Sequence, residues 1–269
     1  MSDPILSHER VATAQPAHWL YVLHGMFGAG RNWATVGRRI ARARPDWGVV
    51  LVDLRQHGAS QDFPPPHTIE AAADDVLKLA DGTGEAVGAV VGHSFGGKVA
   101  LALALHPPPT LRQVWVVDST PAAGEPGGSA WEMLGIVRRL PEQFATRDEG
   151  IDALVANGVA PPTAQWMGTN LVPAEDGFRW RFDPDALDAL LRDFFRTDLW
   201  PVVERPPENV SIHFVKATES SVLAPAAVAR VEAANGPVHV HRVTGGHWLN
   251  ADNPGALVEL LVRALPVEG

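Results

Sequence analysis

Short apolar runs alternate along the chain with segments in which apolar residues recur at spacings of three and four. The runs are typical of buried strands, and the spacing is typical of helices. The predicted strands are residues 18–23, 47–55, 87–91, 113–118, 210–216 and 238–243. The predicted helices are residues 31–44, 68–79, 98–106, 225–234 and 254–265. This order predicts an α/β fold with a mostly parallel central sheet and helices on both faces.

The alternation stops between residues 122 and 209. Helices are predicted there at residues 131–140, 148–157 and 184–195, and residues 178–182 are the one strand candidate. The sequence therefore predicts a sheet domain, residues 1–121 and 210–269, with an inserted helical cap, residues 122–209. The aromatic residues of this cap either form its core or line a cleft above the sheet. Because the segment follows a strand end, we expect an apolar cleft. Its candidate residues are Phe27, Trp131, Trp166 and Trp248.

A single serine stands where a predicted buried strand turns sharply into a helix. The turn reads Gly92-His93-Ser94-Phe95-Gly96. Small residues are needed two positions before and after the serine, because a Cβ there would collide with neighbouring backbone. The pattern is typical of a nucleophile elbow, which exposes the serine hydroxyl beside a helix N-terminus. Ser94 is therefore the predicted nucleophile.

A serine nucleophile needs a base to take its proton and an acid to orient that base. His247 lies in a loop directly after the last predicted strand, at the same sheet edge as Ser94, and is the predicted base. Asp118 and Glu219 are the two candidates for the acid. Asp118 ends a hydrophobic strand, whereas the usual acid position of the later loop is occupied by Ser220. We expect Asp118 to be the acid and Glu219 to be the alternative.

Acyl transfer also requires backbone N–H groups that stabilise a developing oxyanion. The amide of Phe95, directly after the predicted nucleophile, is one expected donor. The other is Met26, which lies in a glycine-bearing loop after the first long predicted strand. Asp53 precedes Ser94 in the chain, the wrong order for the acid, and we expect it to pair with Arg55.

Composition and charge exclude several other functions. A net charge of −9 argues against nucleic-acid binding, and the absence of cysteine excludes thiol catalysis, disulfides and Cys-ligated zinc. No phosphate-binding or dinucleotide loop is complete, so no cofactor is predicted.

The side chains of His239 and His241 are predicted to lie on the same face of one strand. Weak metal binding by this pair is one interpretation, and an exposed sheet face without a metal is the expected one. The apolar stretches are too short to span a bilayer, and a cytoplasmic protein without membrane insertion is expected.

Five motifs together resemble the α/β-hydrolase superfamily. They are residues 24–28, 53–60, 92–98, 117–121 and 246–248. The Gly97-Lys98 pair and the Asp118-Ser119-Thr120-Pro121 strand end are similar, more narrowly, to YbfF-type bacterial esterases. In that branch the acid follows the strand after the elbow helix, which matches Asp118, and a serine holds the usual acid position, which matches Ser220. The loop that holds Ser220 reads Ala217-Thr218-Glu219-Ser220, where these relatives tend to have glycines. The Pro-rich cap is also unlike theirs, and both departures leave the identity of the substrate open.

The resemblance implies hydrolysis of carboxylic esters and acyl thioesters. We therefore expect a serine hydrolase for small to medium acyl chains, with a small-molecule ester or thioester as its partner and Ser220 supporting the His247 and Asp118 pair. A cofactor-free haloperoxidase or perhydrolase, or a carbon–carbon bond hydrolase, would use the same residues. A non-catalytic ligand-binding protein of this fold is the alternative from a different functional class.

Overall fold

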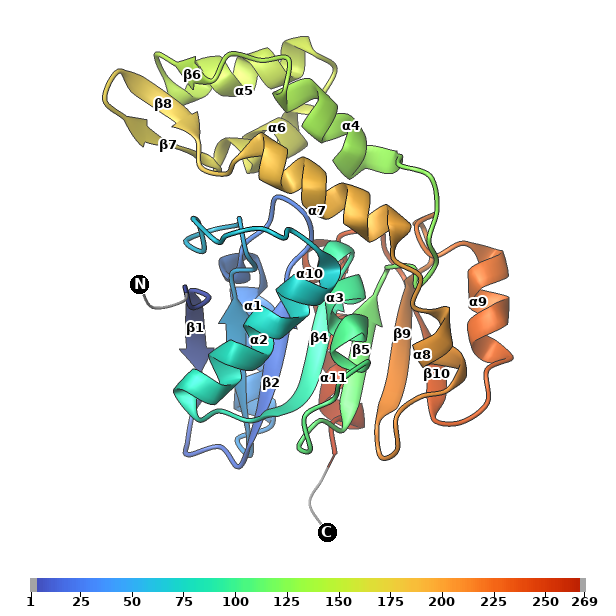
Figure 1. The fold of residues 1–269 in the computed structure, drawn as a ribbon. Helices are drawn as coiled ribbons and strands as arrows, with labels where there is room; N and C mark the ends of the chain where they lie inside the picture. The colour runs from blue at the N-terminus through green and yellow to red at the C-terminus, as the bar shows by residue number, and fades with distance from the viewer. Residues whose placement is uncertain (1–3, 267–269) are drawn as a thin grey trace.

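The computed structural model describes residues 4–266, which contain a seven-stranded sheet (Figure 1). Its strands are β1 (His8–Val11), β2 (His18–Leu23), β3 (Trp47–Val52), β4 (Val87–His93), β5 (Gln113–Val117), β9 (Ser211–Ala217) and β10 (Val238–Val243). Their order across the sheet is β1-β3-β2-β4-β5-β9-β10, and within it only the pairing of edge strand β1 with β3 is antiparallel. The predicted mostly parallel sheet is confirmed. Residues 1–3 and 267–269 of the predicted sheet domain lie outside the described residues.

Helices cover both faces of the sheet, which explains why its central strands read as continuous apolar runs. On one face lie α2 (Ile69–Thr83), α3 (Phe95–Leu103), α8 (Trp200–Glu204) and α9 (Pro225–Glu232); on the other lie α1 (Ala34–Ala43) and α11 (Pro254–Ala264). Strand β4 shows the division: Val90 packs into the first core, whereas Ala89 and Val91 pack into the second. Two short helices, η1 (Gly30–Trp33) and α10 (Leu249–Asp252), lie in loops after β2 and β10.

The segment between β5 and β9, called the insertion below, lies over the carboxyl ends of the sheet strands (Figure 1). It contains α4 (Gly128–Val137), α5 (Arg147–Ala156), α6 (Pro161–Gly168) and α7 (Pro184–Arg196). It also contains a small antiparallel sheet of β6 (Gln143–Phe144), β8 (Gly177–Trp180) and β7 (Leu171–Ala174). Strand β8 overlaps the strand candidate at residues 178–182, whereas β6 and β7 were not predicted. Strands β6 and β7 are too short to show an alternating pattern, and β7 includes Pro173.

Lys98 joins the insertion to the elbow helix α3. Its side chain is fully buried, and Nζ donates hydrogen bonds to the carbonyl oxygens of Ala122 (2.7 Å), Phe194 (2.6 Å) and Thr197 (2.9 Å). These carbonyls belong to both ends of the insertion, where the chain leaves the sheet and where it returns. Burial lowers the pKa of Lys98 to about 8, although Asp198 and Asp193 favour its charged form. One side chain therefore holds both connections in place.

The predicted pairing of Asp53 with Arg55 is wrong. Arg55 instead forms a buried ion pair with Asp75 of α2 (Nε to Oδ2, 2.6 Å). The two carboxylate oxygens of Asp53 accept backbone N–H groups from Gly30 (2.7 Å) and Ala59 (2.8 Å). Asp53 therefore connects the loop after β3 to the loop after β2. These segments are distant in the chain, so no local sequence pattern predicts the contact.

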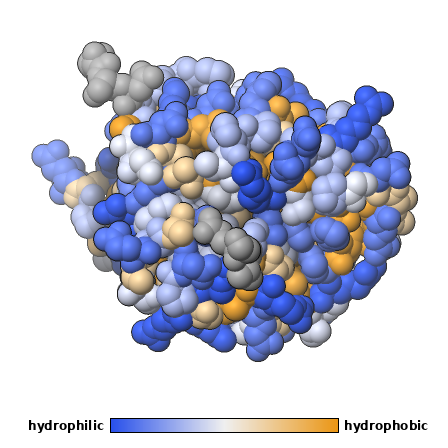
Figure 2. All heavy atoms as spheres, turned by 90° about the horizontal axis from the view of Figure 1, so that it is seen from below, coloured by the Kyte–Doolittle hydropathy of each residue, from blue (hydrophilic) through white to orange (hydrophobic). Residues whose placement is uncertain are grey.

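The face of the molecule opposite the insertion is mainly hydrophilic. Figure 2 shows hydrophobic residues there only as small areas separated by hydrophilic ones. Within residues 4–266, no helix combines the length and the apolar character that a membrane span requires. The cavities described next lie at the other end of the sheet, beneath the insertion.

Candidate active site

Ser94 occupies the sharp turn between β4 and α3 and has a strained backbone, with φ 53° and ψ −116°. Such positive φ values are unfavourable for a residue with a side chain and persist only where packing enforces them. A Cβ on Gly92 would lie 1.9 Å from the Gly96 oxygen, and one on Gly96 would lie 2.4 Å from the His24 oxygen. Only glycine fits at both positions, so this sequence forms the tight elbow that raises Ser94 above the sheet edge.

Asp118 and His247 meet at the same end of the sheet. Asp118 follows β5 and is fully buried, and its Oδ2 lies 2.7 Å from Nδ1 of His247, which follows β10. Burial alone would raise the pKa of Asp118, but hydrogen bonds from His247, Ser220 and the Ala217 amide together hold that pKa below its ordinary value. An ionised carboxylate only accepts hydrogen bonds, so Nδ1 of His247 carries the proton and Nε2 is left as an acceptor.

The alternative acid, Glu219, lies apart from this pair. Its side chain is exposed, and its amide nitrogen donates to the Gly245 oxygen (3.0 Å). The carboxylate hydrogen-bonded to His247 is that of Asp118. Ser220 is placed beside Asp118, as its hydrogen bond to that carboxylate shows, and its Oγ also accepts the Val222 amide (3.2 Å).

Three buried histidines support the loops around Ser94 and were not singled out by the sequence. Burial lowers the pKa of His24 to about 4, and that of His57 and His93 to about 3, so all three are neutral near pH 7. His24 Nε2 accepts the Leu54 amide (3.0 Å), which leaves Nδ1 to donate to the Gly25 oxygen (2.8 Å). His93 Nε2 lies 2.7 Å from the backbone oxygen of His247. The motifs that contain these residues were the only available signal.

The two predicted oxyanion donors lie at the start of α3 and on the loop after β2. Phe95 is the first residue of α3, and the first N–H groups of a helix have no partner within it. Met26 follows Gly25, whose own Cβ, if it existed, would lie 3.0 Å from His93 Nδ1. Met26 and Ser94 line the same cavity. The structure thus brings the Met26 loop against the elbow, and a side chain at position 25 would crowd the His93 ring.

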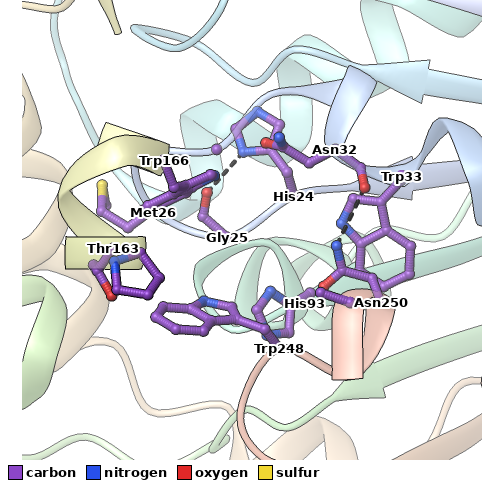
Figure 3. Close-up of a pocket in the computed structure, with 13 residues that line it drawn as sticks. His24, Gly25, Met26, Asn32, Trp33, His93, Thr163, Trp166, Trp248 and Asn250 are labelled. Carbon is purple, nitrogen blue, oxygen red and sulfur yellow. Dashed lines mark hydrogen bonds between the residues drawn. The ribbon is translucent and has the colours of Figure 1, made fainter. Parts of the chain in front are cut away.

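Two adjoining cavities lie between this edge and the insertion. The smaller, about 160 Å³, is lined by Ser94 and His247 together with Met133 of α4. The larger, about 320 Å³, extends between α6 and the loops after β2 and β10 (Figure 3). Trp166 and Trp248 line both cavities, with ring centroids 6.0 Å apart.

Of the two remaining pocket candidates, one lines a cavity and the other does not. Phe27 lines the smaller cavity. Trp131 lines neither; its ring packs edge-on against Phe195 (6.0 Å) and beneath the Arg192 guanidinium (5.0 Å). Trp131 lies on the side of α4 that packs against α7. The orientation of α4 therefore turns this ring away from the cavity.

Within the described part of the chain, no group of three or more His, Asp or Glu residues is arranged to hold a metal ion. His241 Nε2 lies 3.1 Å from Nδ1 of His213, a partner from the neighbouring strand that the sequence did not suggest. His213 in turn stacks on Trp115, with ring centroids 4.1 Å apart. Together these three rings form an aromatic cluster across strands β5, β9 and β10.

A sequence model of the alpha/beta hydrolase family matches residues 20–260. The chain belongs to the alpha/beta hydrolase family. Its relatives in this family include the mouse sn-1-specific diacylglycerol lipase ABHD11, 28% identical over 90% of this chain and 79% of the mouse protein. Lipase LipV of Mycobacterium tuberculosis is 27% identical over 79% of this chain and 78% of its own length. Among solved structures, a marine microorganism esterase superposes with a TM-score of 0.83 at 22% identity, covering 97% of this chain and 99% of the esterase.

Proposed function

We propose that this alpha/beta hydrolase cleaves carboxylic esters or acyl thioesters of small to medium acyl chains through an acyl-enzyme on Ser94. The observation that carries the proposal is the 2.7 Å hydrogen bond between His247 and buried Asp118, at the sheet edge where the strained elbow presents Ser94. A serine, a base and an orienting acid are the groups that nucleophilic acyl transfer requires. Relatives named lipases and an esterase of the same fold support ester hydrolysis.

In the first step of the proposed reaction, Ser94 Oγ attacks the substrate carbonyl carbon. His247 Nε2 takes the hydroxyl proton, and Asp118 stabilises the resulting imidazolium through Nδ1. The carbonyl oxygen becomes an oxyanion, which the Phe95 and Met26 N–H groups stabilise at the start of α3. His247 then returns the proton to the leaving alcohol or thiol as the tetrahedral intermediate collapses to the acyl-enzyme.

In the second step, water attacks the acyl-enzyme carbonyl. His247 removes a proton from that water, and a second tetrahedral intermediate uses the same two N–H groups. Its collapse releases the carboxylic acid and returns the proton to Ser94 Oγ. Ser220, hydrogen-bonded to Asp118, helps keep that carboxylate ionised throughout the cycle.

The cavities support substrates of limited size. The larger, about 320 Å³, lies at the lower end of the range of roughly 300–1,000 Å³ found for small-molecule sites. Trp166 and Trp248 border both cavities, so they are placed to hold an acyl chain or a leaving group beside Ser94. We expect turnover to be greatest for short and medium p-nitrophenyl esters and to decline for long ones.

The decisive test compares Ser94→Ala with Ser129→Ala, because both serines line the smaller cavity. Turnover of p-nitrophenyl butyrate should fall by a factor on the order of 10⁶ in the first variant. It should remain near wild type in the second. A fluorophosphonate should add covalently to Ser94 in the wild-type protein, as read by mass spectrometry of the labelled peptide.

Retained turnover in Ser94→Ala would refute the proposed nucleophile. A protein that neither labels nor hydrolyses any ester or thioester in a panel of graded chain length would instead be a ligand-binding member of the family. Products formed with peroxide or from a diketone would identify the perhydrolase or carbon–carbon hydrolase alternatives, which use the same residues.

A further inference from the structure

A third cavity, called the hairpin cleft here, lies between the β7–β8 hairpin and the loop that joins β3 to α2. Figure 1 shows this hairpin above that loop. The cleft has a volume of about 780 Å³, and its polar lining includes Gln56, Gln61, His67, Arg179 and Arg181. It shares no lining residue with the two cavities beside Ser94. The proposed ester hydrolysis assigns no role to it.

Two buried nitrogen atoms of the cleft residues have no hydrogen-bond partner. Among the described residues only five buried side-chain atoms are in this state, and Nε of Arg181 and Nδ1 of His67 are two of them. A guanidinium Nε always carries a proton, so Arg181 offers a donor without an acceptor. Buried donors of this kind are rare in folded proteins, because an unmade hydrogen bond there is unfavourable. Both atoms belong to residues that line the cleft.

Arginines lie near these donors without forming ion pairs within the described residues. Burial, together with the charges of Arg31 and Arg147, lowers the pKa of Arg181 although Asp53 opposes this. Over residues 4–266, no carboxylate lies within the 4.0 Å of an ion pair from Arg31, Arg147, Arg179 or Arg181. By contrast, three arginines elsewhere in the insertion are all paired with aspartates. They are Arg138, Arg192 and Arg196.

Two of the carboxylates near the cleft accept backbone amides, and two aspartates line the cleft together with the arginines. Asp53 binds the Gly30 and Ala59 amides, and Asp183 accepts the Asp185 amide as the N-cap of α7. Asp62 also lines the cleft, but it is exposed. In the part of the chain that the structure describes, Arg179 and Arg181 therefore line the cleft without a carboxylate in ion-pair contact. A planar guanidinium matches carboxylate and phosphate oxygens, which accept two parallel N–H bonds.

We propose that the hairpin cleft binds an oxyanion, a carboxylate or phosphate group, through Arg181 and Arg179. His67 Nδ1 supplies a further donor when it carries the proton. Such an anion would rest beside Phe182, whose ring lies 5.5 Å from that of Phe27 on the wall of the Ser94 cavity. This aromatic pair separates the two sites. The oxyanion therefore belongs either to a remote part of the substrate or to a free small ligand.

The test measures binding of inorganic phosphate and of succinate to the full chain by isothermal titration calorimetry, with ionic strength held constant. Both probes should bind saturably to the wild-type protein. Arg181→Gln should weaken binding by about tenfold or more, because it removes the charged fork. Arg192→Gln is the matched control on exposed α7 and should bind as wild type. Arg179→Gln, an exposed position, should weaken binding several-fold and serves if Arg181→Gln fails to fold.

Equal affinity in the wild type and in a folded Arg181 or Arg179 variant would overturn the proposal, and so would the absence of saturable binding of either probe. Because the measurement is direct binding, a failure of ester hydrolysis leaves it unaffected. The source of the anion follows from two p-nitrophenyl esters of equal acyl length, the anionic hemisuccinate and the neutral butyrate. If the substrate carries the anion, Arg181→Gln lowers kcat/KM for the hemisuccinate alone. If a free ligand does, only phosphate or succinate binding falls.

Discussion

The sheet edge that carries Ser94 and the insertion above it are held in place by different means. At the edge, backbone packs directly on backbone: a Cβ on Gly96 would lie 2.4 Å from the His24 oxygen, and Asp118 is fully buried. The insertion joins the sheet through two chain crossings, which pair at Leu199 N to Pro121 O (2.8 Å) and are held by Lys98. The edge permits one geometry, whereas the insertion meets the sheet through side chains: these polar contacts and its share of the first hydrophobic core.

This difference suggests that the sheet edge carries the proposed catalytic groups and that the insertion shapes the substrate cavity. The groups proposed to break and make bonds come from strand ends, where their positions tolerate almost no change. The groups that border the substrate cavity from above, such as Trp166 and Met133, come from the insertion. Its arrangement can therefore vary without moving Ser94, His247 or Asp118. The predictions below test this division.

The largest effect is expected from Asp118→Asn, which keeps the size of the side chain but removes its charge. The amide no longer fixes the His247 proton on Nδ1, so kcat for a p-nitrophenyl ester should fall by about 10⁴. Glu219→Gln, at an exposed position in the nearby loop, should leave kcat within about twofold of wild type. Circular dichroism checks that both variants fold. A larger loss in the Glu219 variant would reassign the acid.

A smaller effect, on stability and substrate binding, is expected from Lys98→Met. Three carbonyl oxygens lose their shared donor, which should lower the free energy of unfolding by about 2–4 kcal/mol in urea titrations. A loosened insertion should raise KM for medium-chain esters more than it lowers kcat. Arg38→Met, at an exposed position of α1, is the control and should change neither quantity appreciably. Equal costs in the two variants would show that the buried contacts do not hold the insertion.

The smallest effect is the contribution of a single buried histidine to the dependence of stability on pH. Such histidines belong to the sheet region alone, because residues 122–209 contain no histidine. Burial lowers the pKa of His24 to about 4 and that of His57, His93 and His213 to about 3. Unfolding frees each ring to bind a proton below its ordinary pKa of about 6.5. Stability is therefore fully present above about pH 6.5 and is lost as pH falls toward 3 or 4. The loss amounts to at most about 1.4 kcal/mol per pH unit for each ring.

Urea titrations at several pH values between neutral and mildly acidic measure this dependence. His213→Gln should reduce its slope, whereas His106→Gln, at an exposed position, should not. An unchanged slope in the His213 variant would show that this ring binds a proton equally readily in folded and unfolded chains, contrary to the prediction.

Much of the fold could be predicted because its signals are local. Each buried strand is an apolar run, and each covering helix has apolar residues at spacings of three and four. The elbow is indicated by the two glycines around Ser94. Strand ends alone also placed His247 and Asp118 at one edge, since parallel strands end together. The small strands β6 and β7 were missed for the opposite reason: they carry too few residues to show a pattern, and only pairing with β8 makes them strands.

The sequence by itself determined the layered sheet, the elbow and the order in which the proposed nucleophile, acid and base arrive at one edge. Only the tertiary structure decided which carboxylate touches His247, that Arg55 pairs with Asp75 instead of Asp53, and that Trp131 turns away from the cavity. It alone brought Arg181 and His67 together in the hairpin cleft. Periodicity and turn chemistry act over a few residues, whereas these contacts join segments far apart in the chain and depend on how whole elements pack.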